Sequence, residues 1–236
     1  MDHFLYRNGQ LMAEDVPLAD IAAQVGTPFY VYSAATLLRH FKLFDDALEG
    51  TDHLVCFAVK SLSNVAVLKL LGDAGAGMDV VSAGEYLRAK AAGVPGDRIV
   101  FSGVGKTREE MRIALEGGIR QFNVESEPEM QRLSDVAVSL GKVAPITVRV
   151  NPDVDAKTHE KIATGKSENK FGIPFERANG VYQTIAECDH LKAVGIDMHI
   201  GSQITDLEPF DNAFKLMAEL VEKLGNAGHK IEHIDV

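Results

Sequence analysis

Short apolar runs rich in β-branched residues alternate with longer segments of helical periodicity along most of the chain. This alternation, repeated six times, predicts parallel strands joined by right-handed helical crossovers. Seven strands are expected, at His53–Val59, Met78–Ser82, Arg98–Gly103, Gln121–Glu125, Ile146–Asn151, Ala193–Ile200 and His233–Val236. Helices are expected between them, at Asn64–Leu71, Gly84–Ala92, Arg108–Glu116, Glu127–Leu140, Glu176–Glu187 and Pro209–Asn226, with another at Ala34–Leu48 before the first strand.

Two α/β architectures fit a parallel sheet, an open doubly wound sheet and a closed (β/α)8 TIM-like barrel. The open sheet usually has a glycine-rich turn after its first strand, and here that turn reads Lys60-Ser-Leu-Ser-Asn64. We therefore expect the barrel. A complete barrel needs eight strands and about 250 residues. This chain has 236 residues and seven expected strands, so we expect an incomplete barrel that is the N-terminal portion of a longer two-domain protein.

The helix starts repeat one pattern, Ser/Thr-x-x-Glu. It occurs at Ser82–Glu85, Thr107–Glu110, Ser126–Glu129 and Thr205–Glu208. In such a capping box the hydroxyl and the carboxylate each accept a backbone N–H that the first helical turn leaves unpaired. Four capping boxes are predicted.

The first 33 residues follow a different pattern. Phe4–Leu11 reads as a hairpin around Asn8-Gly9, Pro17–Val25 as a short helix and Thr27–Tyr32 as an extended strand. We expect residues 1–33 to be an arm that belongs to another sheet, in a C-terminal β-domain absent from this sequence. Residues 34–236 would form the barrel.

Composition restricts the classes of partner. The net charge of −10 opposes binding to nucleic acid or to an anionic membrane surface. No apolar run has the length of a membrane span, and the N-terminus does not resemble a secretory signal. Two cysteines, Cys56 and Cys188, are too few for a disulfide framework and are expected to be buried free thiols. These features predict a soluble, acidic, cytoplasmic globular protein.

The active site of a barrel lies at the C-terminal ends of its strands. The expected strands deliver chemically active side chains there: Lys60, Asp79, Ser82, Arg149, Asn151 and His199. Lys60 follows four apolar or small residues, so its amine is either desolvated and nucleophilic or held in solvent above a packed stem. His199 suits stacking on a planar cofactor, acid–base work or a plain structural role. Gly201-Ser202 suits a phosphate or an ordinary turn.

Two further motifs are set aside. Gly103–Thr107 resembles the end of a phosphate-binding P-loop, but the glycine that the full motif requires five positions before Gly105 is Val100. His229 and His233 lack the cysteine, histidine or carboxylate partners of a zinc site. No metal site is expected.

Four stretches resemble, in order, the motifs of the pyridoxal-phosphate decarboxylases with an alanine-racemase-like barrel. They are Cys56–Asn64, Asp79–Glu85, Arg149–Ile173 and His199–Gln203. The first is similar to the cofactor-lysine motif of that family, and the last to its histidine and phosphate-binding turn. The long third stretch closely resembles the diaminopimelate decarboxylases within the family.

The resemblance implies that pyridoxal 5'-phosphate is the cofactor and that Lys60 binds it covalently. His199 would stack on the cofactor ring and would be, with Lys60, a catalytic residue. Asp79 would lie near Lys60, Arg149 would line the cofactor pocket, and Ser202 would help to bind the phosphate.

The resemblance also implies that Lys170, Phe171 and Gly172 lie on a substrate loop. The reaction would be decarboxylation of meso-2,6-diaminopimelate to L-lysine and CO2, in lysine biosynthesis, by a full-length homodimer. This chain alone would be inactive. Two alternatives stay open: a related barrel decarboxylase of ornithine, arginine or carboxynorspermidine, and a non-catalytic homologue that only binds pyridoxal phosphate.

Overall fold

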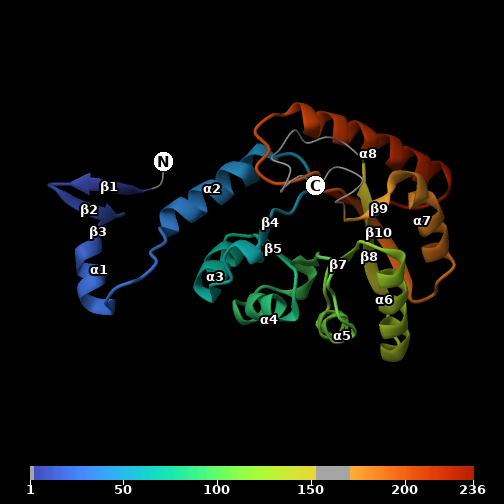
Figure 1. The fold of residues 1–236 in the computed structure, drawn as a ribbon, viewed down its shortest axis with the longest axis horizontal. Coiled ribbons are helices and arrows are strands. Elements are labelled where there is room, and N and C mark those ends of the chain that lie inside the picture. The colour runs from blue at the N-terminus through green and yellow to red at the C-terminus, as the bar shows by residue number, and fades with distance from the viewer. Residues whose placement is uncertain (1–2, 153–170) are drawn as a thin grey trace.

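The computed structural model describes residues 3–152 and 171–236. Within them, seven parallel strands form one curved sheet, which confirms the predicted α/β fold with an incomplete barrel (Figure 1). A two-residue strand, β9 (Ile173–Pro174), pairs with β8 beside this path. In sheet order the seven strands are β4 (Cys56–Ala58), β5 (Gly77–Val80), β6 (Ile99–Phe101), β7 (Gln121–Val124), β8 (Ala144–Asn151), β10 (Leu191–Asp197) and β11 (His233–Asp235).

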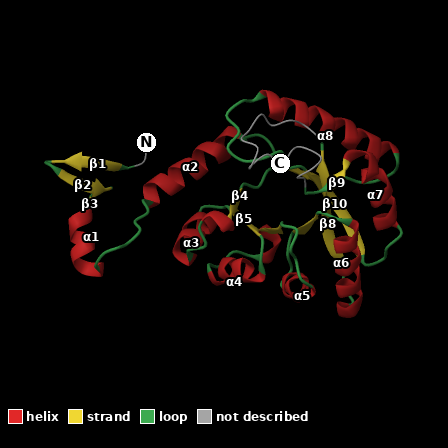
Figure 2. Cartoon of the chain, in the orientation of Figure 1, coloured by secondary structure: helices red, strands yellow, loops and turns green. Residues whose placement is uncertain are grey.

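Helices follow the strands as predicted and cover the outer face of the sheet (Figure 2). The helix α8 is the longest and runs over the end where β10 and β11 lie. The α-helices of this region are α2 (Ala34–Ala47), α3 (Val65–Asp73), α4 (Ala83–Ala91), α5 (Arg108–Glu116), α6 (Glu127–Leu140), α7 (Ala178–Ala186) and α8 (Glu208–Asn226). Short 3-10 turns lie at Val59–Ser61, Gly96–Arg98 and Phe175–Arg177.

Alternate residues of each strand face the helices and form the core. On β7 these are Phe122 and Val124, both fully buried. The Phe122 ring stacks on Phe101 of β6, with ring centroids 5.9 Å apart. Because strand side chains alternate between faces, the residues between them point to the inner side of the barrel. Each fully buried large apolar side chain contributes about 1.5–3 kcal/mol to the free energy of unfolding. The packing between the helices and the outer face of the sheet therefore stabilises the fold.

Close packing of β10 against β11 requires a glycine. A Cβ added at Gly195 would lie 2.4 Å from the backbone oxygen of His233 and 2.9 Å from its ring. A larger residue would have to separate the two strands, because the obstructing atoms belong to the backbone and to a hydrogen-bonded ring.

Of the four predicted capping boxes, one is complete and two are present only as serine caps. The box at α5 is complete, with Thr107 and Glu110 each accepting the other's backbone N–H. At α4 and α6 the serine caps the helix, but the glutamate accepts the amide one residue upstream of that serine. The box at Thr205–Glu208 is wrong, because Asp206 accepts the Glu208 N–H instead.

The N-terminal segment forms a separate small sheet. Its strands are β1 (Phe4–Arg7), β2 (Gln10–Ala13) and β3 (Val16–Pro17), and α1 (Leu18–Val25) follows, so the predicted hairpin and helix are confirmed. The segment Thr27–Tyr32, predicted to be a strand of another sheet, is irregular and pairs with no strand among the described residues.

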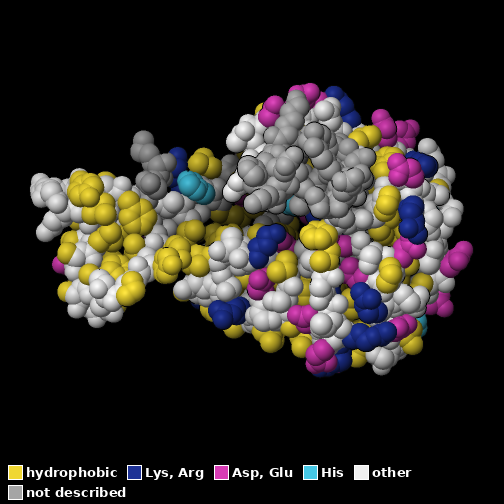
Figure 3. Space-filling view, in the orientation of Figure 1, with side chains coloured by type: hydrophobic (Ala, Val, Ile, Leu, Met, Phe, Trp, Pro, Cys, Tyr) yellow, Lys and Arg dark blue, Asp and Glu magenta, His cyan; other side chains and the backbone are white. Residues whose placement is uncertain are grey.

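The small sheet and α1 lie to one side of the barrel, and α2 connects the two parts (Figure 1). The carboxylate of Glu14 accepts hydrogen bonds from the Ser33 hydroxyl and the Ala35 N–H, which joins the end of β2 to the start of α2. Hydrophobic side chains gather on the surface of this region (Figure 3). Tyr30, for example, is 91% exposed.

Candidate active site

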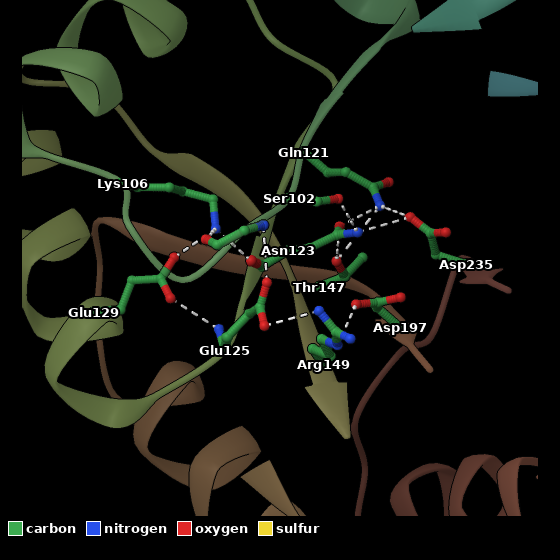
Figure 4. Close-up of polar contacts among 11 residues, drawn as sticks. Ser102, Lys106, Gln121, Asn123, Glu125, Glu129, Thr147, Arg149, Asp197 and Asp235 are labelled. Carbon is green, nitrogen blue, oxygen red and sulfur yellow. Dashed lines mark hydrogen bonds and ion pairs between the residues drawn. The ribbon is translucent and has the colours of Figure 1, made fainter. Parts of the chain in front are cut away.

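Polar and charged side chains gather on the inner side of the sheet (Figure 4). Six of them occupy strand positions that alternate with the helix-facing ones: Gln121, Asn123, Thr147, Arg149, Asp197 and Asp235. Ser102 and Glu125 directly follow β6 and β7, Lys106 lies in the loop after β6, and Glu129 lies on α6. Neighbouring strands are in register here, since Asn123 pairs with Thr147 and Arg149 pairs with Asp197. The polar side chains drawn together are Ser102, Lys106, Gln121, Asn123, Glu125, Glu129, Thr147, Arg149, Asp197 and Asp235.

Arg149 lies at the centre of the charged part of this lining. Its Nη1 donates to Glu125 Oε2 at 2.8 Å, and its Nε lies 3.9 Å from Asp197 Oδ2. Its guanidinium is 5.8 Å from the ring centroid of Phe171. Arg149 is therefore held in a nearly buried position by two carboxylates and an aromatic face.

A second group of hydrogen bonds connects β7 to β11 across the sheet. The side-chain amides of Gln121 and Asn123 donate to the same oxygen of Asp235, at 3.0 and 2.9 Å. Asn123 also donates to the Ser102 hydroxyl and accepts from Thr147. These bonds fix the inward curvature of the sheet, because β7 and β11 are separated by two strands in the sheet order.

Three carboxylates inside the barrel are held away from water. Burial raises the pKa of Asp79 to about 6, and it also raises the pKa values of Asp197 and Asp235. The carboxylate of Asp235 adds to this rise in Asp79 and in Asp197. One oxygen of Asp79, Oδ1, is buried and has no hydrogen-bond partner.

The predicted residues Lys60 and His199 lie where β4 and β10 end. Lys60 is exposed in the short 3-10 turn after β4, so the structure shows the solvent-reaching arrangement rather than the desolvated one. Partial burial and the positive charges of Arg149 and Lys60 lower the pKa of His199 to about 4. The charge of Lys60 also acts on Asp79, where it lowers the pKa.

The turn after His199 has an unusual backbone. Gly201 has φ +139°, and Gln203, which is not a glycine, has φ +59°. Ser202 lies exposed between them. Such conformations cluster at ligand sites. A pocket opens beside this turn, lined by His199, Gly201 and the apolar side chains Met198, Ile200, Phe210, Ala213, Phe214 and Val236.

The structure thus brings Lys60, Asp79, Arg149 and His199 within electrostatic reach of one another. Of the expected substrate loop, Phe171 contacts Arg149, and Gly172 packs so tightly that a Cβ there would lie 3.0 Å from the Arg149 backbone oxygen. Lys170 lies outside the described residues, as do the other residues between 153 and 170 that carried the resemblance.

Several residues of the site were missed by the sequence analysis. None of Glu125, Asn123, Asp197 and Asp235 was proposed as a site residue. Asn123 and Asp197 are buried on strands, Glu125 is buried directly after β7, and Asp235 is half-buried on β11. The signal was present, because polar residues recur at every second position of β7 and β8. A strand that alternates in this way inside an α/β barrel has one polar face.

Lys60, Asp79, Arg149, His199 and the turn at Ser202 are compatible with a pyridoxal phosphate group. The unpartnered Asp79 oxygen is a buried acceptor in need of a donor, and the turn places the exposed Ser202 hydroxyl between two positive-φ residues, Gly201 and Gln203. Lys60 offers an accessible primary amine for covalent attachment. Within the described residues, no cluster of histidine, cysteine and carboxylate groups could hold a metal ion.

The two cysteines are free and partly buried. Burial and the carboxylates of Asp235 and Asp79 raise the pKa of the Cys56 thiol to about 12, which keeps it protonated. Among the described helices, none combines the length and the apolar character that a membrane span requires.

Residues 34–236 match the family model for the pyridoxal-binding domain of pyridoxal-dependent decarboxylases. The chain belongs to this family, and pyridoxal phosphate is the cofactor that the domain binds. The chain is 53% identical over 236 residues to the diaminopimelate decarboxylase of Pseudomonas aeruginosa. It is 54% identical over 237 aligned positions to that of Vibrio cholerae.

These two alignments include the whole of this chain but only 57% of each relative, so the chain spans a little over half of their length. Among solved structures, diaminopimelate decarboxylase from Helicobacter pylori complexed with L-lysine superposes with a TM-score of 0.88. The sequence identity is 38%, and the alignment covers 92% of this chain and 55% of that one.

Proposed function

We propose that the protein to which this chain belongs decarboxylates meso-2,6-diaminopimelate to L-lysine and CO2, a step of lysine biosynthesis. The observation that carries the proposal is 53–54% identity, over the whole chain, to enzymes named for this reaction. The L-lysine in the Helicobacter pylori structure is the expected product. The amino-acid substrate would bind at the C-terminal ends of the strands, near Arg149 and Phe171.

In the proposed site, Lys60 binds the cofactor covalently and His199 stacks on its ring. Bound pyridoxal phosphate supplies an electron sink for the electron pair that remains when CO2 leaves. His199, with its pKa near 4, stays neutral at physiological pH and keeps a flat uncharged face toward the ring. Ser202 and the backbone of its turn hold the phosphate.

Asp79 and Arg149 set the charge around the reacting groups. Burial raises the pKa of Asp79 to about 6, so its carboxyl can hold or release a proton near neutral pH beside the charge of Lys60. Arg149 presents a fixed positive charge to the pocket, held by Glu125. Phe171 and Gly172 place the end of the substrate loop against Arg149, and we assign Lys170 to the same loop.

We also propose the organisation of the full-length protein. Residues 1–33 would be an arm that packs on a C-terminal β-domain, and residues 34–236 would be the cofactor barrel. The exposed aromatic side chains on the arm, such as Tyr30, support such packing. The enzyme would work as a cytoplasmic homodimer, with no nucleic acid or membrane as partner, and this chain alone would be inactive.

The test is an activity panel on the full-length protein. We expect release of CO2 and formation of L-lysine from meso-2,6-diaminopimelate, with no turnover of ornithine, arginine or carboxynorspermidine. Lys60→Ala should abolish both the turnover and the visible absorption band of the bound cofactor. Turnover of ornithine with none of diaminopimelate would refute the substrate assignment. An intact absorption band without any turnover would favour the non-catalytic alternative.

A further inference from the structure

Lys106, which the sequence analysis set aside with its P-loop-like motif, is a completely buried cation. Its side chain has no exposed surface, and that of its ion-pair partner Glu129 is 2% exposed. The ammonium donates to three acceptors at 2.7 Å each, Glu129 Oε1 and the backbone oxygens of Gly103 and Asn123. All three donors of the ammonium are used, so no donor remains for a phosphate.

The ion pair continues toward the active site through Glu129 and Glu125. The second oxygen of Glu129 accepts the backbone N–H of Glu125 at 2.9 Å. Glu125 Oε1 accepts the N–H of Gly103 at 2.8 Å, and its Oε2 accepts Nη1 of Arg149 at 2.8 Å. A continuous series of charged hydrogen bonds therefore runs from Lys106 through Glu129 and Glu125 to Arg149 (Figure 4).

Gly103 is held from both ends within this series. Its carbonyl accepts from Lys106 and its N–H donates to Glu125. Its φ of +93° is in the left-handed region, and an added Cβ would lie 3.3 Å from Val81. The loop that follows β6 is thereby fastened to the end of β7, where the Glu125 side chain must point at Arg149.

The four charges Lys106, Glu129, Glu125 and Arg149 sum to zero. Buried ion pairs of this kind contribute little to stability compared with apolar residues of the same size, because removing the charges from water is costly. What these charges do provide is a hydrogen-bonded position for the Arg149 guanidinium. A free arginine side chain has many rotamers, and the contacts of its guanidinium with Glu125 and Asp197 restrict their number.

We propose that Lys106 is a positioning residue for the cofactor site: through Glu129 and Glu125 it fixes the guanidinium of Arg149, which would lie beside the cofactor. The inference rests on the proposed function only in placing pyridoxal phosphate next to Arg149. It does not depend on which amino acid the enzyme decarboxylates, because cofactor binding is measured without substrate.

The test is a double-mutant cycle on the full-length protein freed of cofactor. The variants are Lys106→Met, Arg149→Met and the combination, and the readout is the dissociation constant of pyridoxal phosphate. We expect Lys106→Met to weaken binding by about tenfold, within the range seen when a residue that orients a metal ligand is removed. In the Arg149→Met background, the same substitution should change the affinity by less than about twofold, because the effect passes through Arg149.

A matched control separates positioning from a loss of folding stability. Leu133 is fully buried on α6, one helical turn after Glu129, but it makes none of these hydrogen bonds. Leu133→Ala should lower the melting temperature and leave the cofactor affinity within about twofold of that of the unaltered protein. If Lys106→Met yields no folded protein, Glu129→Gln takes its place in the cycle, since it keeps the shape and removes the charge.

Two results would overturn the proposal. One is that Lys106→Met weakens cofactor binding by the same factor in the Arg149→Met background as in the unaltered protein. The other is an effect no larger than that of Leu133→Ala at a comparable loss of melting temperature. Turnover of ornithine instead of diaminopimelate would refute the proposed function and leave the outcome of this cycle valid.

Discussion

Replacing Asp79 by asparagine should make the cofactor-free protein more stable at neutral pH and leave its stability unchanged in acid. Asp79 lies inside the barrel on β5, and its Oδ1 lacks a hydrogen-bond partner. Burial is the main cause that raises the pKa of this carboxyl from 3.8 to about 6. In the unfolded chain the carboxyl loses its proton near pH 4, whereas in the folded protein it keeps the proton until about pH 6.

Between these two values the folded state binds more protons than the unfolded state, so the free energy of unfolding falls as pH rises. Above pH 6 both states are ionised, and the loss stays constant. The two pKa values, 3.8 and about 6, correspond to about 3 kcal/mol at roughly 1.4 kcal/mol per pH unit. The asparagine side chain is uncharged at every pH, so Asp79→Asn should remove this loss.

The assay is urea unfolding of the cofactor-free protein at pH 4 and pH 8, followed by circular dichroism. We expect the variant and the unaltered protein to unfold at similar urea concentrations at pH 4. At pH 8 the variant should be more stable by up to about 3 kcal/mol. A stability difference that is the same at both pH values, or a variant that is less stable at pH 8, would refute the reasoning.

Three further predictions concern His199, Gly195 and Phe122. Arg149→Met should raise the pKa of His199 from about 4 toward its ordinary value, since the guanidinium charge helps to lower it; a ¹³C-histidine NMR titration measures this, and an unchanged pKa would contradict the placement. Gly195→Ala should destabilise the protein by about 1–3 kcal/mol in thermal unfolding, because its methyl group would overlap the His233 backbone. Phe122→Ala should cost about 3–5 kcal/mol in urea unfolding, whereas Val138→Ala on the exposed side of α6 should change stability by less than about 0.5 kcal/mol.

The alternation of strands and helices was predictable because each element carries its own local signal. Polar and apolar residues alternate along Gln121–Glu125, which is the period of a strand. The helix Glu127–Leu140 has its capping residues, Ser126 and Gly141, directly at its two ends. The structure differs from the prediction where local signals were ambiguous. Aromatic residues at Thr27–Tyr32 are typical of a strand, but a strand also needs a neighbour, and the described residues provide none. At Thr205–Glu208 two possible caps lie side by side, and Asp206 forms the hydrogen bond.

The site was only partly predictable for a related reason. Lys60, Asp79 and His199 were found by position at the ends of strands and by motif. The hydrogen bonds that hold Arg149 join residues from separate strands and helices, and no local pattern specifies which carboxylate reaches it. Lys106 shows the same limit, since its motif resembles a phosphate loop while its partner lies 23 residues away on α6.

Each strand of the sheet carries two sets of side chains, one facing the helices and one facing the interior of the barrel. On β7, the even-numbered residues Phe122 and Val124 face the helices, and the odd-numbered residues Gln121 and Asn123 face the interior. A substitution in one set leaves the other set's neighbours untouched. Inward-facing residues can therefore be substituted one at a time, which changes the chemistry of the interior. The helix-facing residues continue to pack against the helices. The same alternation makes β7 sensitive to insertions. A single inserted residue would turn the following core side chains toward the interior and the following polar side chains toward the helices, so both the core packing and the polar lining would be lost.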